Sequence, residues 1–80
     1  MRLDKYLKVS RLIKRRTIAN EACDAGRITA NGKIAKASYD VKEGEGLEIR
    51  LGERVMRVRV LSTPEHVLKN DAALMYEVLS

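Results

Sequence analysis

The sequence of 80 residues contains no tryptophan, no phenylalanine, one proline, one cysteine and one histidine. A single cysteine cannot form an internal disulfide, and small secreted domains usually depend on several, so the composition predicts a reducing, cytoplasmic setting. No apolar run approaches the roughly 20 residues that span a bilayer, and we expect no membrane contact. The core must therefore be built from leucine, isoleucine, valine and three tyrosines.

Residue types that catalyse reactions or bind metals are scarce. His66 falls in an expected loop after Pro64, and Cys23 falls among alanines on an expected helix, where a small buried thiol is ordinary packing. No two cysteines or histidines have ligand spacing, and zinc sites need three or four ligands. Neither phosphate-binding motif, GxxxxGK[ST] or GxGxxG, occurs. We expect no enzyme activity, no metal and no cofactor.

Positive charge is concentrated in the first half of the chain. The net charge is +5, and residues 1–36 hold ten Lys/Arg against three Asp/Glu, whereas residues 37–80 hold six against eight. Such a distribution suits a localised anionic partner better than general solubility. On charge alone, a solvated basic face without a ligand fits equally well.

A short helix is predicted over residues 2–9. Leu3, Tyr6 and Leu7 fall on one stripe at 100° per residue and would face the core. The basic residues of the segment fall on a neighbouring arc. The first helix would therefore carry one face for the core and one basic face.

A second helix is predicted to begin within residues 15–17 and to end at Ala25, with Gly26 as its left-handed stop. Its expected core face consists of Ile18, Ala22 and Ala25, with Ala19 and Cys23 at the margin of that face. A helix start exposes unpaired backbone N–H groups and the positive end of the helix dipole. Because this start follows three consecutive basic residues, it would attract phosphate.

Beyond the helices the apolar period changes to two. Residues 28–35 predict a hairpin whose Asn31-Gly32 turn is of type I′. Residues 47–60 predict a second hairpin about Gly52-Glu53, with an apolar inner face and opposite charges that pair across its outer face. Residues 74–79 could add a last strand. Two short N-terminal helices packed on a small, mostly antiparallel sheet make an α+β fold.

RNA is favoured over DNA as the anionic partner. The outward side of the second helix offers Glu21 and Asp24, which a phosphate-lined groove would repel. Binding would then use the rim of the helix pair and the hairpin tip, which suits recognition of structured RNA by shape. Base stacking would be minor, because Tyr6 and Tyr76 fit core positions and only Tyr39 is free.

Four segments together resemble the RNA-binding domain family named after ribosomal small-subunit protein four, whose core is the αL motif of two short helices and a loop-hairpin. They are "RLDKYL" at 2–7, "RLIKRR" at 11–16, "AGRITANGKIAKAS" at 25–38 and "VKEGEGLEI" at 41–49. The resemblance implies one RNA-binding domain over residues 1–80, with the αL motif over about 1–36 and a β-rich remainder over 37–80.

The resemblance also implies which residues contact RNA. They are Arg2, Lys5, Arg11, Lys14, Arg15, Arg16, Arg27, Asn31 and Lys33. Asp4 would orient a neighbouring basic side chain rather than touch RNA. Family members often have serine or threonine as a helix N-cap where Arg15 stands, so here the cap is lost or passes to Thr17.

Within the family, the short chain resembles a small ribosome-associated heat-shock protein and its shorter Gram-positive relative. That resemblance implies a monomer that binds large-subunit RNA and peptidyl-tRNA after a stalled ribosome has split. There it would help a quality-control elongation factor to add an alanine tail. One alternative is a ribosome-assembly or RNA-targeting module that works with a separate RNA-modifying enzyme. Another is an interaction protein whose basic face meets an acidic protein.

Overall fold

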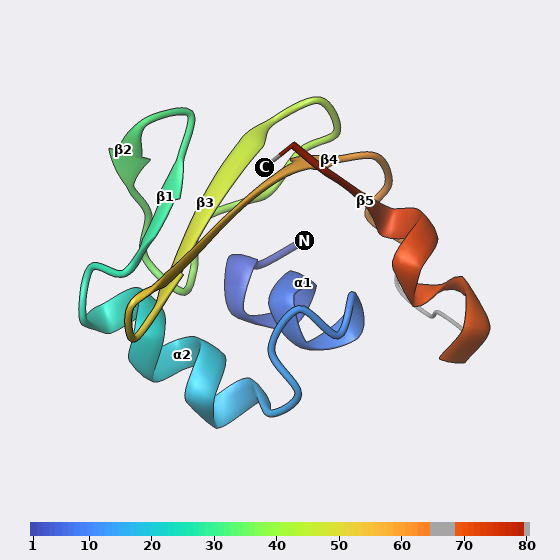
Figure 1. The fold of residues 1–80 in the computed structure, drawn as a ribbon. Coiled ribbons are helices and arrows are strands. Elements are labelled where there is room, and N and C mark those ends of the chain that lie inside the picture. The colour runs from blue at the N-terminus through green and yellow to red at the C-terminus, as the bar shows by residue number, and fades with distance from the viewer. Residues whose placement is uncertain (65–68, 80) are drawn as a thin grey trace.

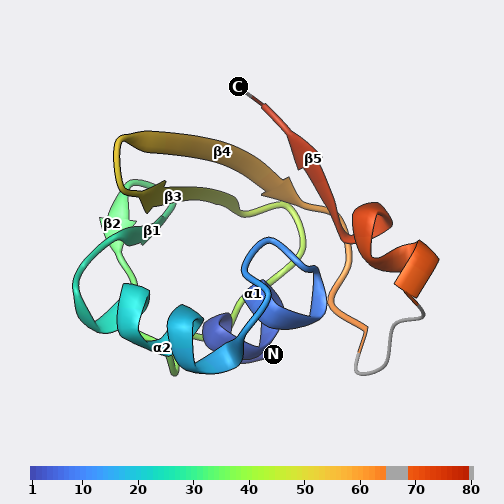
Figure 2. The same cartoon turned by 60° about the horizontal axis from the view of Figure 1, so that its bottom comes forward.

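The computed structural model describes residues 1–64 and 69–79, arranged as a helical layer on a five-stranded antiparallel sheet (Figure 1). Along the chain the elements are α1 (Leu3–Val9), α2 (Arg16–Asp24), β1 (Ile28–Ala30), β2 (Lys33–Ile34), β3 (Gly46–Leu51), β4 (Arg54–Val60), the 3-10 helix η1 (Lys69–Met75) and β5 (Tyr76–Val78). The sheet order is β2-β1-β3-β4-β5. The α+β prediction is confirmed, and α1 and α2 lie on the same face of the sheet (Figure 2).

Helix α1 forms as its apolar stripe predicts. Leu3, Tyr6 and Leu7 are fully buried. The helix ends because Arg11 adopts a positive φ of 65°, and the chain then turns back to place Ile13 in the core. The Ile13 N–H donates to the Leu7 carbonyl at 3.0 Å, so the loop after α1 is bonded to the helix itself.

Helix α2 begins at Arg16 without a side-chain cap, because the N-cap residue Arg15 has no acceptor atom for a backbone N–H of the first turn. It ends in a Schellman motif at Gly26, whose φ is 74°. The Gly26 N–H donates to the Cys23 carbonyl and the Arg27 N–H donates to the Ala22 carbonyl, both at 3.0 Å. The predicted glycine stop is therefore confirmed.

The predicted core face of α2 is partly wrong. Ile18 is 45% exposed and Ala25 is also exposed, whereas Ala19, Ala22 and Cys23 are buried. The helix is rotated toward its small residues, which lets its backbone approach α1 and the sheet closely. Ile18 and Ala25 instead line a shallow surface pocket with Leu51 from the end of β3.

The first hairpin is confirmed, with Thr29 opposite Ile34. Both turn residues have positive φ, 53° for Asn31 and 86° for Gly32, as a type I′ turn requires. β1 also pairs with β3, so this hairpin forms one edge of the sheet.

The second hairpin is confirmed in register, with Leu47 opposite Val58 and Glu48 opposite Arg57. On the outer face Glu48 contacts Nε of Arg57 on the opposite strand at 3.4 Å, which is the predicted cross-strand pairing. It also contacts Nε of Arg50 on its own strand at 3.2 Å. The inner face is buried only toward the base of the hairpin. Near the tip, Leu51 and Met56 are exposed.

The predicted last strand is shorter than expected. Leu74 and Met75 belong to η1, and the strand begins at Tyr76. Met75 turns inward and is buried, and its carbonyl accepts a hydrogen bond from the Tyr6 hydroxyl at 2.8 Å. This bond joins η1 to α1. The predicted loop at His66 lies outside the described residues.

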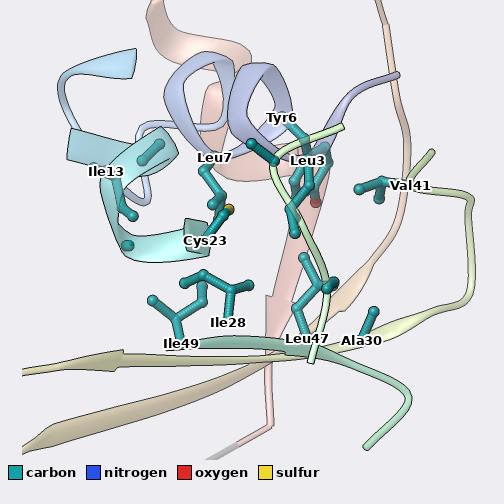
Figure 3. Close-up of a cluster of buried hydrophobic side chains, with 14 of the residues drawn as sticks. Leu3, Tyr6, Leu7, Ile13, Cys23, Ile28, Ala30, Val41, Leu47 and Ile49 are labelled. Carbon is teal, nitrogen blue, oxygen red and sulfur yellow. The ribbon is translucent and has the colours of Figure 1, made fainter. Parts of the chain in front are cut away.

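The core lies between the helices and the inner face of the sheet (Figure 3). Side chains of α1 and α2 meet those of β1 and β3, with Cys23 among them. The largest fully buried side chain is Tyr6, and burial raises the pKa of its hydroxyl. With the core on one side of the helices, the opposite side is left for the basic residues.

Candidate RNA-binding surface

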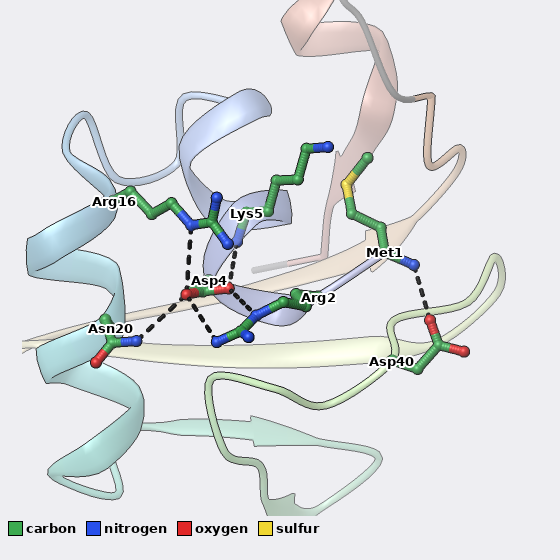
Figure 4. A network of polar contacts seen from close by, with 7 residues as sticks. All are labelled: Met1, Arg2, Asp4, Lys5, Arg16, Asn20 and Asp40. Atoms are coloured by element: carbon green, nitrogen blue, oxygen red, sulfur yellow. Dashed lines mark hydrogen bonds and ion pairs between the residues drawn. The ribbon is translucent and has the colours of Figure 1, made fainter.

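The buried carboxylate of Asp4, in the first turn of α1, gathers polar groups from both helices (Figure 4). Its Oδ1 accepts from Arg2 Nε at 3.2 Å and from the Lys5 backbone N–H at 2.8 Å. Its Oδ2 accepts from Arg16 Nε at 3.4 Å and Asn20 Nδ2 at 3.3 Å, and Arg2 Nη2 lies at 3.4 Å. One carboxylate thus fixes two guanidiniums, as predicted for Asp4.

The electrostatics of this cluster favour an ionised Asp4. Burial by itself would raise the pKa of this carboxyl, but hydrogen bonds from Arg2, Asn20, Arg16 and the Lys5 backbone outweigh burial and lower the pKa. The Asp4 side chain is 3% exposed, whereas those of Arg2 and Arg16 are 52% and 49% exposed. The carboxylate is therefore inaccessible to an anionic ligand, and the cations are accessible.

Arg16 contacts Asp4 through Nε, which leaves both of its terminal nitrogens without a partner among the described residues. A shallow pocket beside it is lined by Asp4, Thr17, Asn20 and Glu21. A guanidinium held through Nε presents its terminal N–H groups in a fixed orientation, which suits bidentate binding of a phosphate.

The other predicted cations of the helix pair lie around this cluster. Lys5 is on α1 next to Asp4, and Arg11, Lys14 and Arg15 are exposed in the loop between the helices. Within residues 1–64 and 69–79, no carboxylate pairs with these three loop cations. The loop is therefore an uncompensated basic rim.

Arg27 and the hairpin residues are not among the hydrogen-bond partners of Asp4. Arg27 is exposed after α2, beside the pocket that contains Ile18 and Leu51. Lys33 is exposed on β2. The side chain of Asn31 is bonded within the protein, because its Nδ2 donates to Glu45 Oε2 at 2.8 Å and its Oδ1 accepts from the Gly46 N–H at 3.1 Å.

The prediction that Tyr39 is free is wrong. Its ring is half-buried against the core, and its hydroxyl donates to Oε2 of Glu45. That hydrogen bond, more than burial or the nearby negative charges, raises the pKa of Tyr39. Tyr39 is therefore tied by its hydroxyl to the loop before β3.

Two residues of the surface were missed from the sequence. Asn20 lies one helical turn after Arg16, and this i, i+4 spacing on α2 was a usable signal. Glu45 had no such signal, because two of its hydrogen-bond partners, Asn31 and Tyr39, are brought next to it by the fold and not by a regular spacing in the sequence.

The N-terminal amine of Met1 donates to Asp40 Oδ1 at 2.7 Å, as Figure 4 also shows. This hydrogen bond, together with the charge of the amine, lowers the pKa of Asp40. The pair lies at the antiparallel bridge between Arg2 and Asp40. It therefore helps to hold the segment that carries Arg2 and Asp4 against the loop after β2.

Within residues 1–64 and 69–79, no three histidine, cysteine, aspartate or glutamate side chains are grouped so that they could hold a metal ion. No helix in this part of the chain is both long and apolar enough to cross a bilayer. Burial, with Asp4 and Asp24 nearby, raises the pKa of the Cys23 thiol to about 11, which is typical of a structural cysteine.

The basic residues of the helix pair are accessible and are organised by one buried carboxylate, which is the arrangement expected of a domain that binds a phosphate-rich ligand. The chain belongs to the S4 domain family, which it matches over residues 1–47. This finding confirms the family resemblance seen in the sequence.

The chain is similar to two curated proteins and to one solved structure within or near this family. The chain is 56% identical to the "RQC P-site tRNA stabilizing factor" of Halalkalibacterium halodurans, over 98% of this chain and 89% of that protein. It is 55% identical to the protein of the same name from Streptococcus pneumoniae, over 100% and 91%. The trimeric structure of Vibrio cholerae Heat Shock Protein 15 superposes with a TM-score of 0.90 at 26% identity, over 100% of this chain and 82% of that one.

Proposed function

We propose that this protein binds ribosomal RNA and tRNA on the large ribosomal subunit and acts there, without catalysis, in ribosome-associated quality control. It steadies a peptidyl-tRNA after a stalled ribosome has split, while a quality-control elongation factor extends the nascent chain with alanines. Relatives that share more than half of the sequence and are named as P-site tRNA stabilizing factors support this role.

The observation that carries the proposal is the pair of half-exposed guanidiniums, Arg2 and Arg16, held by one buried carboxylate. Asp4 cannot bind RNA itself, but it fixes the orientation of both arginines before a phosphate arrives. The loop cations Arg11, Lys14 and Arg15 extend the same surface and have no described acidic partner. Together they would bridge several phosphates at a backbone junction.

A binding titration across salt concentrations tests the proposal. The protein is titrated with purified large ribosomal subunits that carry peptidyl-tRNA, and with empty large subunits as the comparison. We expect the logarithm of the affinity to fall linearly with the logarithm of salt concentration, and the affinity to be higher for the subunits that carry tRNA. Affinity that does not respond to salt would contradict an electrostatic interface.

Two further measurements separate the proposal from its alternatives. If a protein partner remains bound after complete nuclease digestion, the basic surface binds an acidic protein instead of RNA. If the protein co-purifies with an RNA-modifying enzyme and not with split large subunits, it is a targeting module for that enzyme. Imaging the particle that is purified with the protein from cells would show the bound RNA directly.

A further inference from the structure

Glu45, in the loop immediately before β3, is bonded to two earlier parts of the chain. Its Oε2 accepts from Asn31 Nδ2 at 2.8 Å and also from the Tyr39 hydroxyl. Its Oε1 accepts from the Lys42 backbone N–H at 2.6 Å. One carboxylate therefore joins the tip of the first hairpin, the segment after that hairpin and the start of β3.

The hairpin tip is held at this carboxylate through Asn31. Besides its bond to Glu45, Asn31 donates its backbone N–H to the Gly46 carbonyl at 2.8 Å and accepts the Gly46 N–H at Oδ1. Asn31 has a φ of 53°, a left-handed conformation that asparagine adopts more readily than most residues, and these contacts add to that preference. Lys33 follows two residues later, paired with Ala30 across the hairpin, so contacts that place the hairpin tip also place Lys33.

The segment held through Tyr39 also supports the Asp4 cluster. The Tyr39 carbonyl accepts from the Leu3 N–H at 2.8 Å, and the Ala37 carbonyl accepts from the Asp4 N–H at 3.2 Å. Glu45 is thus connected on one side to the hairpin that carries Lys33. On the other side it is connected to the backbone that carries Asp4.

We propose that Glu45 is a positioning residue that fixes the hairpin cation Lys33 relative to the arginines held by Asp4, so that both contact the same RNA together. Asn31 then acts as a clamp for the hairpin rather than as an RNA contact. The inference rests on the proposed RNA-binding function. Both carboxylate oxygens of Glu45 accept hydrogen bonds from the protein itself, which would explain how this acidic residue is compatible with a phosphate-binding surface.

Glu45→Gln tests this role, with Glu43→Gln as the matched control. Both substitutions remove one negative charge from a chain of net charge +5. Glu43 is exposed in the same loop, and its side chain makes no hydrogen bond or ion pair with the described residues. General electrostatics predicts tighter RNA binding for both. We expect Glu43→Gln to bind large subunits carrying peptidyl-tRNA as tightly as the wild type or tighter. We expect Glu45→Gln to bind about fivefold more weakly.

A double-mutant cycle with Lys33→Ala separates positioning from general loss of stability. In the Glu45→Gln background, Lys33→Ala should cost less affinity than in the wild type, because Lys33 is already misplaced. Lys14→Ala, in the loop between the helices, should cost the same in both backgrounds. Additive effects of Glu45→Gln and Lys33→Ala, or binding by Glu45→Gln as tight as by Glu43→Gln, would overturn the proposal.

Tyr39→Phe provides a milder variant in case Glu45→Gln does not fold. It removes one donor to Glu45 and keeps the half-buried ring. A smaller loss of affinity that is likewise non-additive with Lys33→Ala supports the role, and an additive loss overturns it. If the wild-type protein itself shows no salt-dependent binding, the RNA-binding proposal fails instead, so the two failures are distinguishable.

Discussion

Arg16, the first residue of α2, places its Nε 3.4 Å from Oδ2 of Asp4, a carboxylate buried in the first turn of α1. This contact crosses between the two helices at the point where α2 lacks a side-chain cap. The charge of Asp4 therefore serves two purposes. It joins the start of α2 to α1, and it orients a guanidinium whose terminal nitrogens have no partner among the described residues.

Asp4→Asn should destabilise the fold and loosen both arginines. The amide keeps the size of the carboxyl group, but one oxygen becomes a donor that faces the N–H groups of Arg2 or Arg16. Hydrogen bonds to a charged group contribute more than neutral ones, so we expect a loss of about 1–3 kcal/mol in the free energy of unfolding. Urea denaturation measures it, with the exposed Asp24→Asn as control. If Asp4→Asn unfolded at the same urea concentration as the wild type, the stabilising role of Asp4 would be contradicted.

Acid should destabilise the protein through the same carboxyl. Because the pKa of Asp4 is lower in the folded protein than in the unfolded chain, the unfolded chain binds the proton more readily. The stabilisation is thus complete above the unfolded pKa of about 4 and is lost as pH falls through the folded pKa. Thermal melts from pH 6 to pH 2 should show a steeper decline for the wild type than for Asp4→Asn. The variant should keep a weaker decline, since the pKa of Asp40 is also lowered.

Local signals in the sequence were enough to predict most of the fold. The apolar stripe of α1, the glycine stop at Gly26 and the Asn31-Gly32 turn each depend on neighbours within a few residues. The same is true of the alternation in β3 and β4. In each case the physical cause, a periodicity or a positive φ, is contained in the segment itself.

The incorrect predictions concern side chains whose burial or hydrogen bonding depends on tertiary contacts. The nine residues of α2 form two overlapping apolar faces. The face with Ala19 and Cys23 is packed against the core, and the face with Ile18 is exposed. Tyr39 looked free because its partner, Glu45, is set by the loop geometry. The orienting role of Asp4 was predicted, but the second helix's contribution through Asn20 required the helices to be placed side by side.

Arg16→Ala should weaken RNA binding without unfolding the domain. The side chain is half-exposed, so its removal leaves the core intact. Loss of one phosphate contact should lower the slope of log affinity against log salt by about one. Arg54→Ala, an exposed position on β4 beside the tip of the second hairpin, removes the same charge and serves as the control. A slope unchanged by Arg16→Ala but reduced by Arg54→Ala would place the interface elsewhere.

Cys23 should be unreactive in the folded protein. Its thiol is 2% exposed, and its pKa of about 11 leaves little thiolate at pH 8, whereas a free cysteine titrates near 8.5. We expect alkylation by iodoacetamide at pH 8 to be far slower in buffer than in guanidinium chloride. Equal rates in the two solutions would show that α2 opens readily in the native state.

A pair of substitutions on α2 tests which face of the helix is packed. Ala19 is fully buried, so Ala19→Leu forces additional carbons into a filled space and should cost roughly 1–3 kcal/mol. Ile18 is 45% exposed, so Ile18→Ala should change stability by no more than about 0.5 kcal/mol, because little burial is lost and alanine favours the helix. Urea denaturation of both variants measures the difference. If Ile18→Ala were the more costly change, the helix would be rotated toward the face with Ile18, Ala22 and Ala25, and the start of α2 could not present Arg16 to Asp4 as described.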